Sequence, residues 1–292
     1  MAQGSIRHFK VNQGYNDSRA DVCIAAMLPN FTRSSLKQLF EKGLVSVGDK
    51  VIKASYHLRA GDQLNVDTRP LFGKLPAINL NIIFEDRNVI VLNKPAGILT
   101  HAKGGLSNEA TVASFIKKKL NDKKLTGNRA GIVHRLDRGT SGVIITAKNE
   151  LAQKWLQKQF STRKVSKTYR AIVEGVPEPR EAIIDAPIER SPKKPQTFRV
   201  GSSGRPAQTE YKLLKILNQL SILELRPLTG RTHQIRVHLK YIGHPIVGDR
   251  VYGHAGKHLH LHAKSLGVTL PDGRKKQFEA PEPDYFTELA NS

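Results

Sequence analysis

Residues 131–148 read GIVHRLDRGTSGVIITAK. The second half, residues 143–147, is a β-branched run that predicts a buried strand. The first half places the carboxylate of Asp137 between Arg135 and Arg138, and opposite charges this close keep a carboxylate ionised. Two glycines follow, which allow a tight turn or a close approach to a ligand. An exposed turn with an ion pair would share these features, so the surrounding sequence must decide the function.

The 292-residue chain carries a large excess of positive charge. Its 47 Lys and Arg residues against 25 Asp and Glu residues give a formal net charge of +22 and a pI near 10.1. A surface of this charge suits a polyanion such as a nucleic acid. Apolar residues make up 39% of the chain, which is enough for the core of one large domain or two smaller ones.

The single cysteine, Cys23, excludes an intrachain disulfide, so we expect a reducing compartment. Residues 1–15 are polar and lack the apolar run of a signal peptide. No stretch reaches the roughly 18 apolar residues of a membrane helix. We therefore expect a cytoplasmic protein that does not contact a membrane.

The word HRLDRGTSGVIITAK, at residues 134–148, resembles the catalytic signature of the RluA-type pseudouridine synthases. This resemblance implies that Asp137 is the catalytic aspartate. It also implies that Arg135 contacts the RNA where the target uridine leaves the base stack. Arg138, on the other side of the aspartate, is a further candidate for substrate binding.

Two further words match the same family. KTYRAIV, at residues 167–173, resembles its second motif and implies that Tyr169 stacks on the target base. LTGRTHQIRVHL, at residues 228–239, implies that Arg231 pairs with the catalytic aspartate and that Ile235 lies beneath the uracil ring. A strand tyrosine is usually a core residue and Arg231 could form an ordinary helix-start ion pair; the order of the motifs favours the site roles. The words NKPAG and GHPIVGDRVYG also fit this family.

Residues 17–68 resemble an S4 RNA-binding domain, with the words SRAD and RAGDQL near its two ends. The pattern predicts a helix to Leu28, a second helix closed by Gly43, a short hairpin at 44–52 and a last strand at 63–66. The residues before this unit, 1–16, are predicted to form a flexible arm. The candidate phosphate contacts of the unit are Arg19, Arg33, Lys37 and Lys42.

The positive charge is unevenly distributed along the chain. Residues 15–70 contain eight Lys and Arg against six Asp and Glu, so this part carries only +2. Arg7 and Lys10 add another +2, and the remaining +18 lies beyond Pro70. We therefore expect the N-terminal unit to position RNA and the rest of the chain to supply most of the attraction, because phosphate contacts fix register without reading sequence.

A linker is predicted at residues 69–76, where two prolines and a glycine interrupt regular structure. A catalytic domain at 77–284 and a short tail at 285–292 follow. Lys117, Lys118 and Lys119 end a predicted helix and are taken as a phosphate-contacting rim, although a solvated face has the same composition. A second helix, 151–160, is predicted to bury Trp155. Strands are expected at 80–84, 89–92, 168–173, 182–188, 198–200, 207–216, 221–225 and 259–263.

The predicted fold class is α+β. It consists of a small S4-like αα-hairpin domain followed by a catalytic domain whose mixed, mostly antiparallel sheet is flanked by helices. His258, His260 and His262 alternate as they would on one face of a strand, but no Cys or carboxylate lies at ligand spacing, so no metal is predicted. The phosphate-binding patterns GxxxxGK[ST] and strand-following GxGxxG are missing, so no nucleotide cofactor is expected.

The remaining inventory is an ionised aspartate, an arginine, a tyrosine and a basic surface, which suits a redox-neutral isomerisation of a nucleotide. Conversion of uridine to pseudouridine breaks the N1–C1′ bond, rotates the uracil and forms a C5–C1′ bond. The carboxylate can act as nucleophile on the sugar or as base at C2′, and the sequence leaves both open. Loss of the C5 proton needs a base, which could be Tyr169 or a water. The target base must leave the stack, as in other base-flipping enzymes.

We expect a monomeric RNA pseudouridine synthase that needs no cofactor, with large-subunit ribosomal RNA as the favoured substrate and transfer RNA as the alternative. The rival hypothesis is a non-catalytic RNA-binding assembly factor that has kept the fold. Asp137, Tyr169 and Arg231 are all intact, and a pure binding protein could lose any of them.

Overall fold

The computed structural model describes residues 4–29, 31, 33–72, 76–102, 109–127 and 129–291. The chain forms two compact units, each with a hydrophobic core of its own. Unit 1 comprises Met1–Ile78, His101–Phe115 and Thr126–Ala130. Unit 2 comprises Asn79–Thr100, Ile116–Leu125 and Gly131–Ser292.

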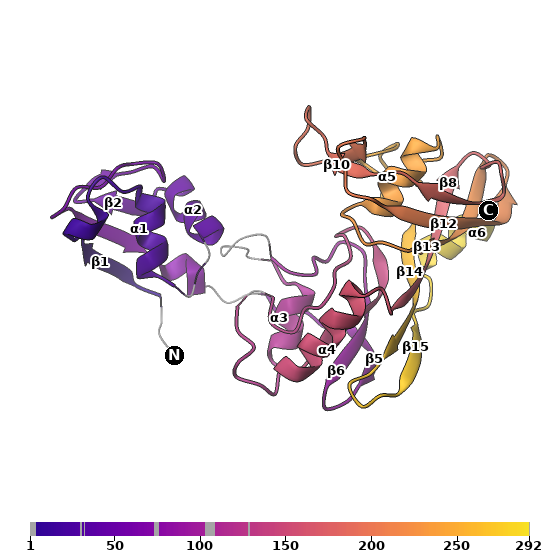
Figure 1. Ribbon diagram of the computed structural model, residues 1–292, viewed down its shortest axis with the longest axis horizontal. Helices are drawn as coiled ribbons and strands as arrows, with labels where there is room; N and C mark the ends of the chain where they lie inside the picture. Colours follow the sequence, from indigo (N-terminus) through magenta and orange to yellow (C-terminus); the bar gives the residue numbers. More distant parts are fainter. Residues whose placement is uncertain are drawn as a thin grey trace. The chain divides into compact units, whose positions relative to one another are not determined.

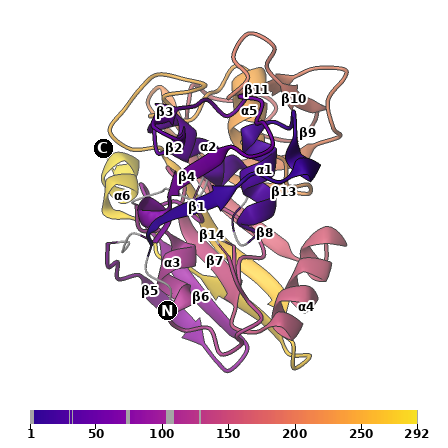
Figure 2. The same ribbon diagram turned by 90° about the vertical axis from the view of Figure 1, so that its left-hand side faces the viewer.

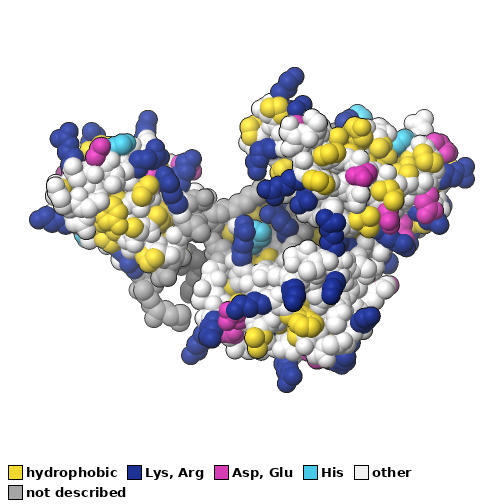
Figure 3. Space-filling view, viewed as in Figure 1, with side chains coloured by type: hydrophobic (Ala, Val, Ile, Leu, Met, Phe, Trp, Pro, Cys, Tyr) yellow, Lys and Arg dark blue, Asp and Glu magenta, His cyan; other side chains and the backbone are white. Residues whose placement is uncertain are grey.

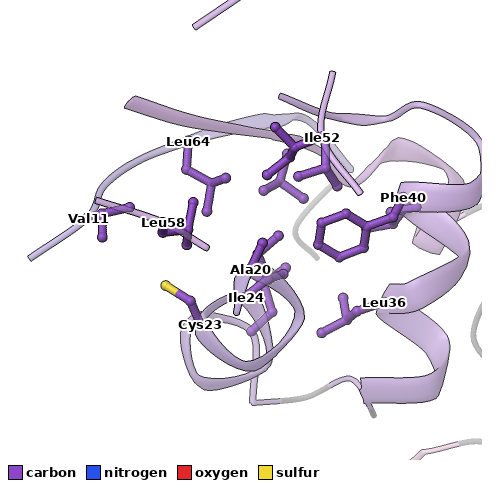
Figure 4. Packing of buried hydrophobic residues seen from close by; sticks show 13 residues of the cluster. Val11, Ala20, Cys23, Ile24, Leu36, Phe40, Ile52, Leu58 and Leu64 are labelled. Atoms are coloured by element: carbon purple, nitrogen blue, oxygen red, sulfur yellow. The ribbon is translucent and has the colours of Figure 1, made fainter. Parts of the chain in front are cut away.

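Unit 1 combines two helices with a four-stranded antiparallel sheet (Figure 1). The helices are α1 (Ala20–Met27) and α2 (Arg33–Glu41), and they present apolar residues at helical spacing to the core. Figure 4 shows Ile24, Leu36 and Phe40 from the helices facing Ile52 and Leu64. The strands, in sheet order, are β1 (Ile6–Lys10), β4 (Gln63–Asp67), β2 (Val45–Val47) and β3 (Lys50–Val51).

The N-terminal segment is more ordered than the expected flexible arm. Ile6–Lys10 forms β1, which pairs antiparallel with β4 from Ile6 opposite Asp67 to Lys10 opposite Gln63. Val11 follows and is buried in the core of unit 1. The prediction of a loose arm is therefore wrong for these residues, because β1 supplies the hydrogen bonds that the edge of β4 would otherwise leave unpaired.

The predicted linker at 69–76 starts with a short 3-10 helix, η2 (Arg69–Phe72). Its residues 73–75 lie outside the described part of the chain. The first helix of the unit begins at Ala20, and Arg19 is its N-cap residue.

Unit 2 is built on a nine-stranded sheet. The strand order is β5-β6-β7-β14-β8-β13-β12-β9, and β15 pairs with β14. Every pairing in it is antiparallel except that of β7 with β14, which confirms the mixed, mostly antiparallel sheet. Figure 2 shows β5, β6 and β7 following one another across the sheet. The strands are β5 (Asn81–Glu85), β6 (Val89–Lys94), β7 (Ser141–Ala147), β8 (Ser166–Glu174), β9 (Glu181–Asp185), β12 (Gln208–Leu217), β13 (Leu220–Pro227), β14 (Leu261–Thr269) and β15 (Lys275–Glu279).

The described residues also form four more α-helices and a small two-stranded sheet. They are α3 (Val112–Lys117), α4 (Glu150–Ser161), α5 (Gln234–Tyr241), α6 (Asp284–Asn291), β10 (Ile188–Arg190) and β11 (Phe198–Val200). The predicted tail at 285–292 is thus mostly helix α6, because Phe286 is buried, 6.0 Å from the ring of His260 between centroids. Within the described residues, no helix is both long and apolar enough to cross a membrane.

Helix α4 packs on the sheet through Ala152 and Leu156, which share a hydrophobic cluster with Val143 and Ile145 of β7. Asn149 caps the helix by accepting a hydrogen bond from the backbone N–H of Ala152 (2.8 Å). Trp155 does not point inward as expected but is 42% exposed. Ala152, Leu156 and Gln159 occupy the inward face at helical spacing, which turns Trp155 to its edge.

The parallel pairing of β7 with β14 depends on Gly142, which lies opposite Ala263 and has a φ of +113°. A Cβ added here would overlap the backbone of Ala263. We expect Gly142→Ala to lower the free energy of unfolding by at least about 2 kcal/mol, measured by urea denaturation. The matched control is Gly273→Ala, which has a φ of +87° but open space around the added atom. Equal losses in the two variants would contradict the steric explanation.

Candidate active site

Hydrogen bonds hold the loop that carries Asp137 on both sides of the aspartate. The hydroxyl of Thr100 donates to the carbonyl of Leu136 (2.9 Å) and accepts from the N–H of the same residue (3.1 Å). The carbonyl of Arg138 accepts a hydrogen bond from the N–H of Gly97 (2.8 Å). The backbone at Asp137 is therefore held between two fixed neighbours.

Lys94 supports the same loop from the interior. Its side chain is fully buried, and its Nζ donates to the carbonyls of Pro95 (2.8 Å), Ile98 (2.9 Å) and Arg138 (3.4 Å). Burial lowers the pKa of Lys94 to about 7, and the charge of Asp137 opposes this change. The NKPAG motif thus supplies a buried lysine, Lys94, whose hydrogen bonds support the loop that carries Asp137.

His134 connects the loop to the sheet and to α4. Its Nε2 accepts a hydrogen bond from the N–H of Ile145 (3.0 Å), and its ring stacks on Phe160 with the centroids 4.4 Å apart. Burial lowers the pKa of His134 to about 3, and the charge of Lys167 adds to this change, so the imidazole is neutral at physiological pH. We conclude that His134 is a structural support for the loop.

Arg236, rather than Arg231, is the arginine that contacts Asp137. Nη1 of Arg236 lies 3.2 Å from Oδ2 of Asp137. Arg231 instead donates from Nε to the carbonyl of Pro206 (3.0 Å). The expected pairing of Arg231 with Asp137 is therefore wrong. Arg231 lies in the turn before α5, whereas Arg236 lies within the helix, so the two side chains leave the backbone in different directions.

Arg236 is itself held by a second, buried carboxylate. Asp249 is 1% exposed and accepts two bonds from Arg236, from Nε and Nη2, both of 2.7 Å. The backbone N–H groups of Val251 and Tyr252 also donate to Asp249 (2.9 and 3.1 Å). Burial alone would lower the pKa of Arg236, but Asp249 and Asp137 raise it overall, so the guanidinium stays charged. Asp249, in the motif GHPIVGDRVYG, thus orients the guanidinium of Arg236 that faces Asp137.

His233 and Tyr252 complete the surroundings of the aspartate. Nε2 of His233 lies 3.7 Å from Oδ2 of Asp137, and Nδ1 lies 2.8 Å from the hydroxyl of Tyr252. Burial lowers the pKa of His233, although the charge of Asp137 opposes this change. The guanidinium of Arg236 lies over the ring of Tyr252, 5.0 Å from its centroid. The fold therefore places His233 beside the carboxylate.

Tyr169 reaches the same region from β8. It lies opposite Ala263 of β14, which in turn lies opposite Gly142 of β7. Burial raises the pKa of Tyr169, and the charge of Asp137 raises it further, so the phenol is neutral at pH 7. A neutral phenol can stack or donate a hydrogen bond, but it is a poor base. Ile235 is 6% exposed and belongs to the hydrophobic cluster against which Tyr169 packs.

Other predicted contact residues lie on the surface. Arg135 and Arg138 are exposed, with Nη1 of Arg138 3.5 Å from the carbonyl of Gly97. Lys117 and Lys118 are exposed, whereas Lys119 pairs with Glu85 (3.1 Å). In unit 1, Arg19 and Arg33 both pair with Asp21, at 3.1 and 2.7 Å, Lys37 lies 3.7 Å from Glu41, and Lys42 is exposed.

The alternating histidines are accounted for by local contacts. His258 stacks on Tyr285 with centroids 4.3 Å apart, and Nδ1 of His262 lies 2.9 Å from the hydroxyl of Ser141. Nδ1 of His260 lies 3.2 Å from the carbonyl of Val247. In the described ranges, no group of three or more His, Cys, Asp or Glu residues is arranged to hold a metal ion.

The geometry defines a carboxylate that faces a permanently charged guanidinium, with a neutral phenol nearby. Residues 88–241, more than half of the chain, match the RNA pseudouridylate synthase family. This range contains Asp137, Tyr169 and Arg236. The chain belongs to this family, and the protein is an RNA pseudouridine synthase.

Whole-length relatives place it in the RluA-type branch. The chain is 37% identical to an "uncharacterized RNA pseudouridine synthase" of Aquifex aeolicus, over 98% of this chain and 96% of the relative. It is 36% identical to "ribosomal large subunit pseudouridine synthase D" of Zymomonas mobilis, over 91% and 90% of the two chains. Among solved structures it resembles human RNA pseudouridylate synthase domain containing 4, with a TM-score of 0.58 and 27% identity over 72% of this chain and 92% of that one.

Proposed function

We propose that Asp137 is the catalytic carboxylate of this synthase and that its substrate is a uridine in large-subunit ribosomal RNA. The observation that carries the first part is the chain of contacts from Asp249 through Arg236 to Asp137. A buried guanidinium fixed by one carboxylate can orient a second carboxylate. The relatives named ribosomal large subunit pseudouridine synthase D support the second part.

The proposed chemistry uses Asp137 as nucleophile at C1′ or as base at C2′ of the target uridine. Arg236 holds the carboxylate in place during the reaction. Tyr169 stacks on the flipped uracil, with Ile235 beneath the ring, and Arg135 takes the space that the base leaves in the stack. Because its pKa is raised, the Tyr169 phenol stays protonated and is a poor acceptor for the C5 proton. A water is therefore the better candidate for this step.

Pseudouridine mapping tests the substrate. Total RNA from a strain that lacks this protein should lose pseudouridine at one or more positions of large-subunit ribosomal RNA. Complementation with the native protein should restore these positions, and complementation with Asp137→Asn should not. Loss confined to transfer RNA would show that the proposed substrate is wrong while leaving the role of Asp137 intact.

We further propose that unit 1 is an S4-like RNA-binding unit that positions the substrate. Its order of two helices, a short hairpin and a last strand supports this likeness. Lys37 belongs to α2 and Lys42 directly follows that helix. Asp21 pairs with both Arg19 and Arg33 and offsets one of these two positive charges. The unit is therefore suited to fixing the position of RNA more than to supplying bulk attraction.

The double reversal Lys37→Glu and Lys42→Glu in the full chain tests this division of labour. We expect the preference for structured ribosomal RNA over an unrelated folded RNA to fall by about tenfold. The salt slope, which is the slope of the logarithm of the binding constant against the logarithm of the salt concentration, should be reduced in magnitude by only about two. The excess charge beyond Pro70 would account for the remaining slope. Filter binding across a salt series measures both quantities, with Lys50→Glu and Lys53→Glu as the control reversal. A slope reduced by more than half would show that unit 1 carries the affinity.

A further inference from the structure

The outer face of α4 combines an aromatic ring with positive charge. Leu151, Lys154, Trp155 and Lys158 follow the spacing i, i+3, i+4 and i+7, so they form one stripe along the helix. All four are exposed, and Leu151 and Trp155 are 81% and 42% exposed. Figure 3 shows hydrophobic and Lys or Arg side chains next to each other over the position of α4 in Figure 1. Large apolar residues here are not needed for the core, because Ala152 and Leu156 already fill the inward face.

The ring of Trp155 is held in a fixed orientation. Its Nε1 donates to the carbonyl of Thr269 (2.9 Å), at the end of β14. Gln159, one turn further along α4, donates to the same carbonyl and accepts from the N–H of Thr269 (3.2 Å). The polar edge of the indole is therefore satisfied while the side chain stays accessible. A ring ordered in advance loses little conformational freedom when another ring stacks on it.

The C-terminal end of α4 contacts the segment that precedes Asp137. Phe160, near the C-terminal end of α4, stacks on His134, which lies three residues before Asp137. Five residues of helix separate Trp155 from Phe160, which corresponds to about 7.5 Å along the axis. Arg163 and Lys164 follow the helix and are exposed. Residues 150–164 contain four Lys and Arg and one Glu, so this segment carries a net positive charge.

We propose that this stripe binds an unpaired nucleotide of the RNA outside the active site, with its base stacked on Trp155 and its phosphate beside Lys158. The partner follows from the charge and from the established substrate class, because an anion with an exposed aromatic face matches a cation beside an exposed ring. Every nucleobase has such a face, so the contact does not depend on sequence. The stripe would hold a part of the RNA that lies outside the active site.

Intrinsic fluorescence tests the contact directly, because Trp155 is the single tryptophan of the chain. The full-length protein is titrated with a short single-stranded oligouridylate and, separately, with a blunt-ended RNA duplex of mixed sequence. We expect the single strand to quench the fluorescence, whereas the duplex, whose bases are already paired and stacked, leaves it nearly unchanged. Quenching should be the same in the Asp137→Asn protein, so this result is independent of the catalytic role proposed for Asp137. No quenching by the single strand would overturn the proposal.

Substitutions separate stacking from a purely structural role of Trp155. Both Trp155→Phe and Trp155→Leu lose the hydrogen bond to Thr269, but only the first keeps a ring. We expect the Leu variant to bind oligouridylate about tenfold more weakly and the Phe variant within about threefold of the native protein. Both should show similar thermal stability, because both lose the same hydrogen bond. Equal affinity in the two variants would show that Trp155 only anchors α4.

The charged half of the stripe has its own test. Lys158→Gln should weaken oligouridylate binding and reduce the salt slope by about one, as expected for one lost phosphate contact. The control is Lys212→Gln on β12, which removes an exposed lysine that pairs with Glu181 at 3.3 Å. An unchanged slope in Lys158→Gln, or an equal loss in Lys212→Gln, would contradict a phosphate contact at Lys158.

Discussion

Asp137→Asn should abolish pseudouridine formation while RNA affinity stays within about tenfold, a difference of less than about 1.4 kcal/mol. Asparagine has nearly the same shape as aspartate, and its oxygen can still accept a hydrogen bond from Arg236. It cannot act as a nucleophile or as a base toward the sugar, so the chemistry should stop. Release of tritium from RNA labelled at C5 of uridine measures the reaction, and filter binding measures the affinity.

The control for this variant is Asp272→Asn, which removes a carboxylate paired with Arg274 at 2.6 Å. It should keep full activity, because this ion pair lies in the turn between β14 and β15. Thermal melts of both variants check that they fold. Substantial tritium release by a folded Asp137→Asn protein would refute the assignment of Asp137, and another carboxylate would then have to be sought.

The second large effect is expected at Arg236. Arg236→Lys should lower kcat by about 100-fold or more, which is the size seen when one fixed electrostatic contact of an active site is removed. An ammonium group cannot form the two parallel bonds to Asp249 and also reach Asp137, because only a guanidinium presents donors in that fork. Single-turnover tritium release measures this step apart from product release.

Lysine is the better substitution at Arg236 because it keeps a positive charge next to the buried Asp249. Removing the charge completely would leave that carboxylate unpaired, at a cost of about 3–5 kcal/mol, and would confuse loss of folding with loss of chemistry. The matched comparison is Arg231→Lys, whose native side chain donates to the carbonyl of Pro206. We expect this variant to keep activity within about tenfold. If Arg231→Lys loses as much activity as Arg236→Lys, the geometry around Asp137 does not describe the working enzyme.

Local sequence was sufficient for many of the elements and for the position of the candidate carboxylate. The β-branched run after Gly142 predicted the buried strand β7, and the strands expected at 80–84 and 89–92 form the β5–β6 hairpin. Each of these features depends on neighbours within a few residues, and such patterns are visible in one dimension. The family resemblance at residues 134–148 also pointed to Asp137, because the matching motif is long and continuous.

The partner of the carboxylate could not be decided in the same way. Arg231 and Arg236 occur in one motif, and nothing in their spacing tells which guanidinium reaches Asp137. The choice follows from where α5 begins and from Asp249, which is 13 residues further along the chain. Asp249 of the motif GHPIVGDRVYG was visible in the sequence as a possible partner for an arginine. Its contact with Arg236 forms only in the folded protein.

Burial was the other property that the sequence left open. The spacing on α4 allowed Trp155 to face the core, yet the inward positions were taken by Ala152, Leu156 and Gln159. Ile6–Lys10 was too polar to predict a strand, and it became one because β4 had an unpaired edge. The sequence by itself thus determined many of the local elements, the excess of positive charge and the candidate aspartate. Only the tertiary structure decided which cation faces Asp137 and which side chains remain exposed, because both depend on contacts between residues far apart in the chain.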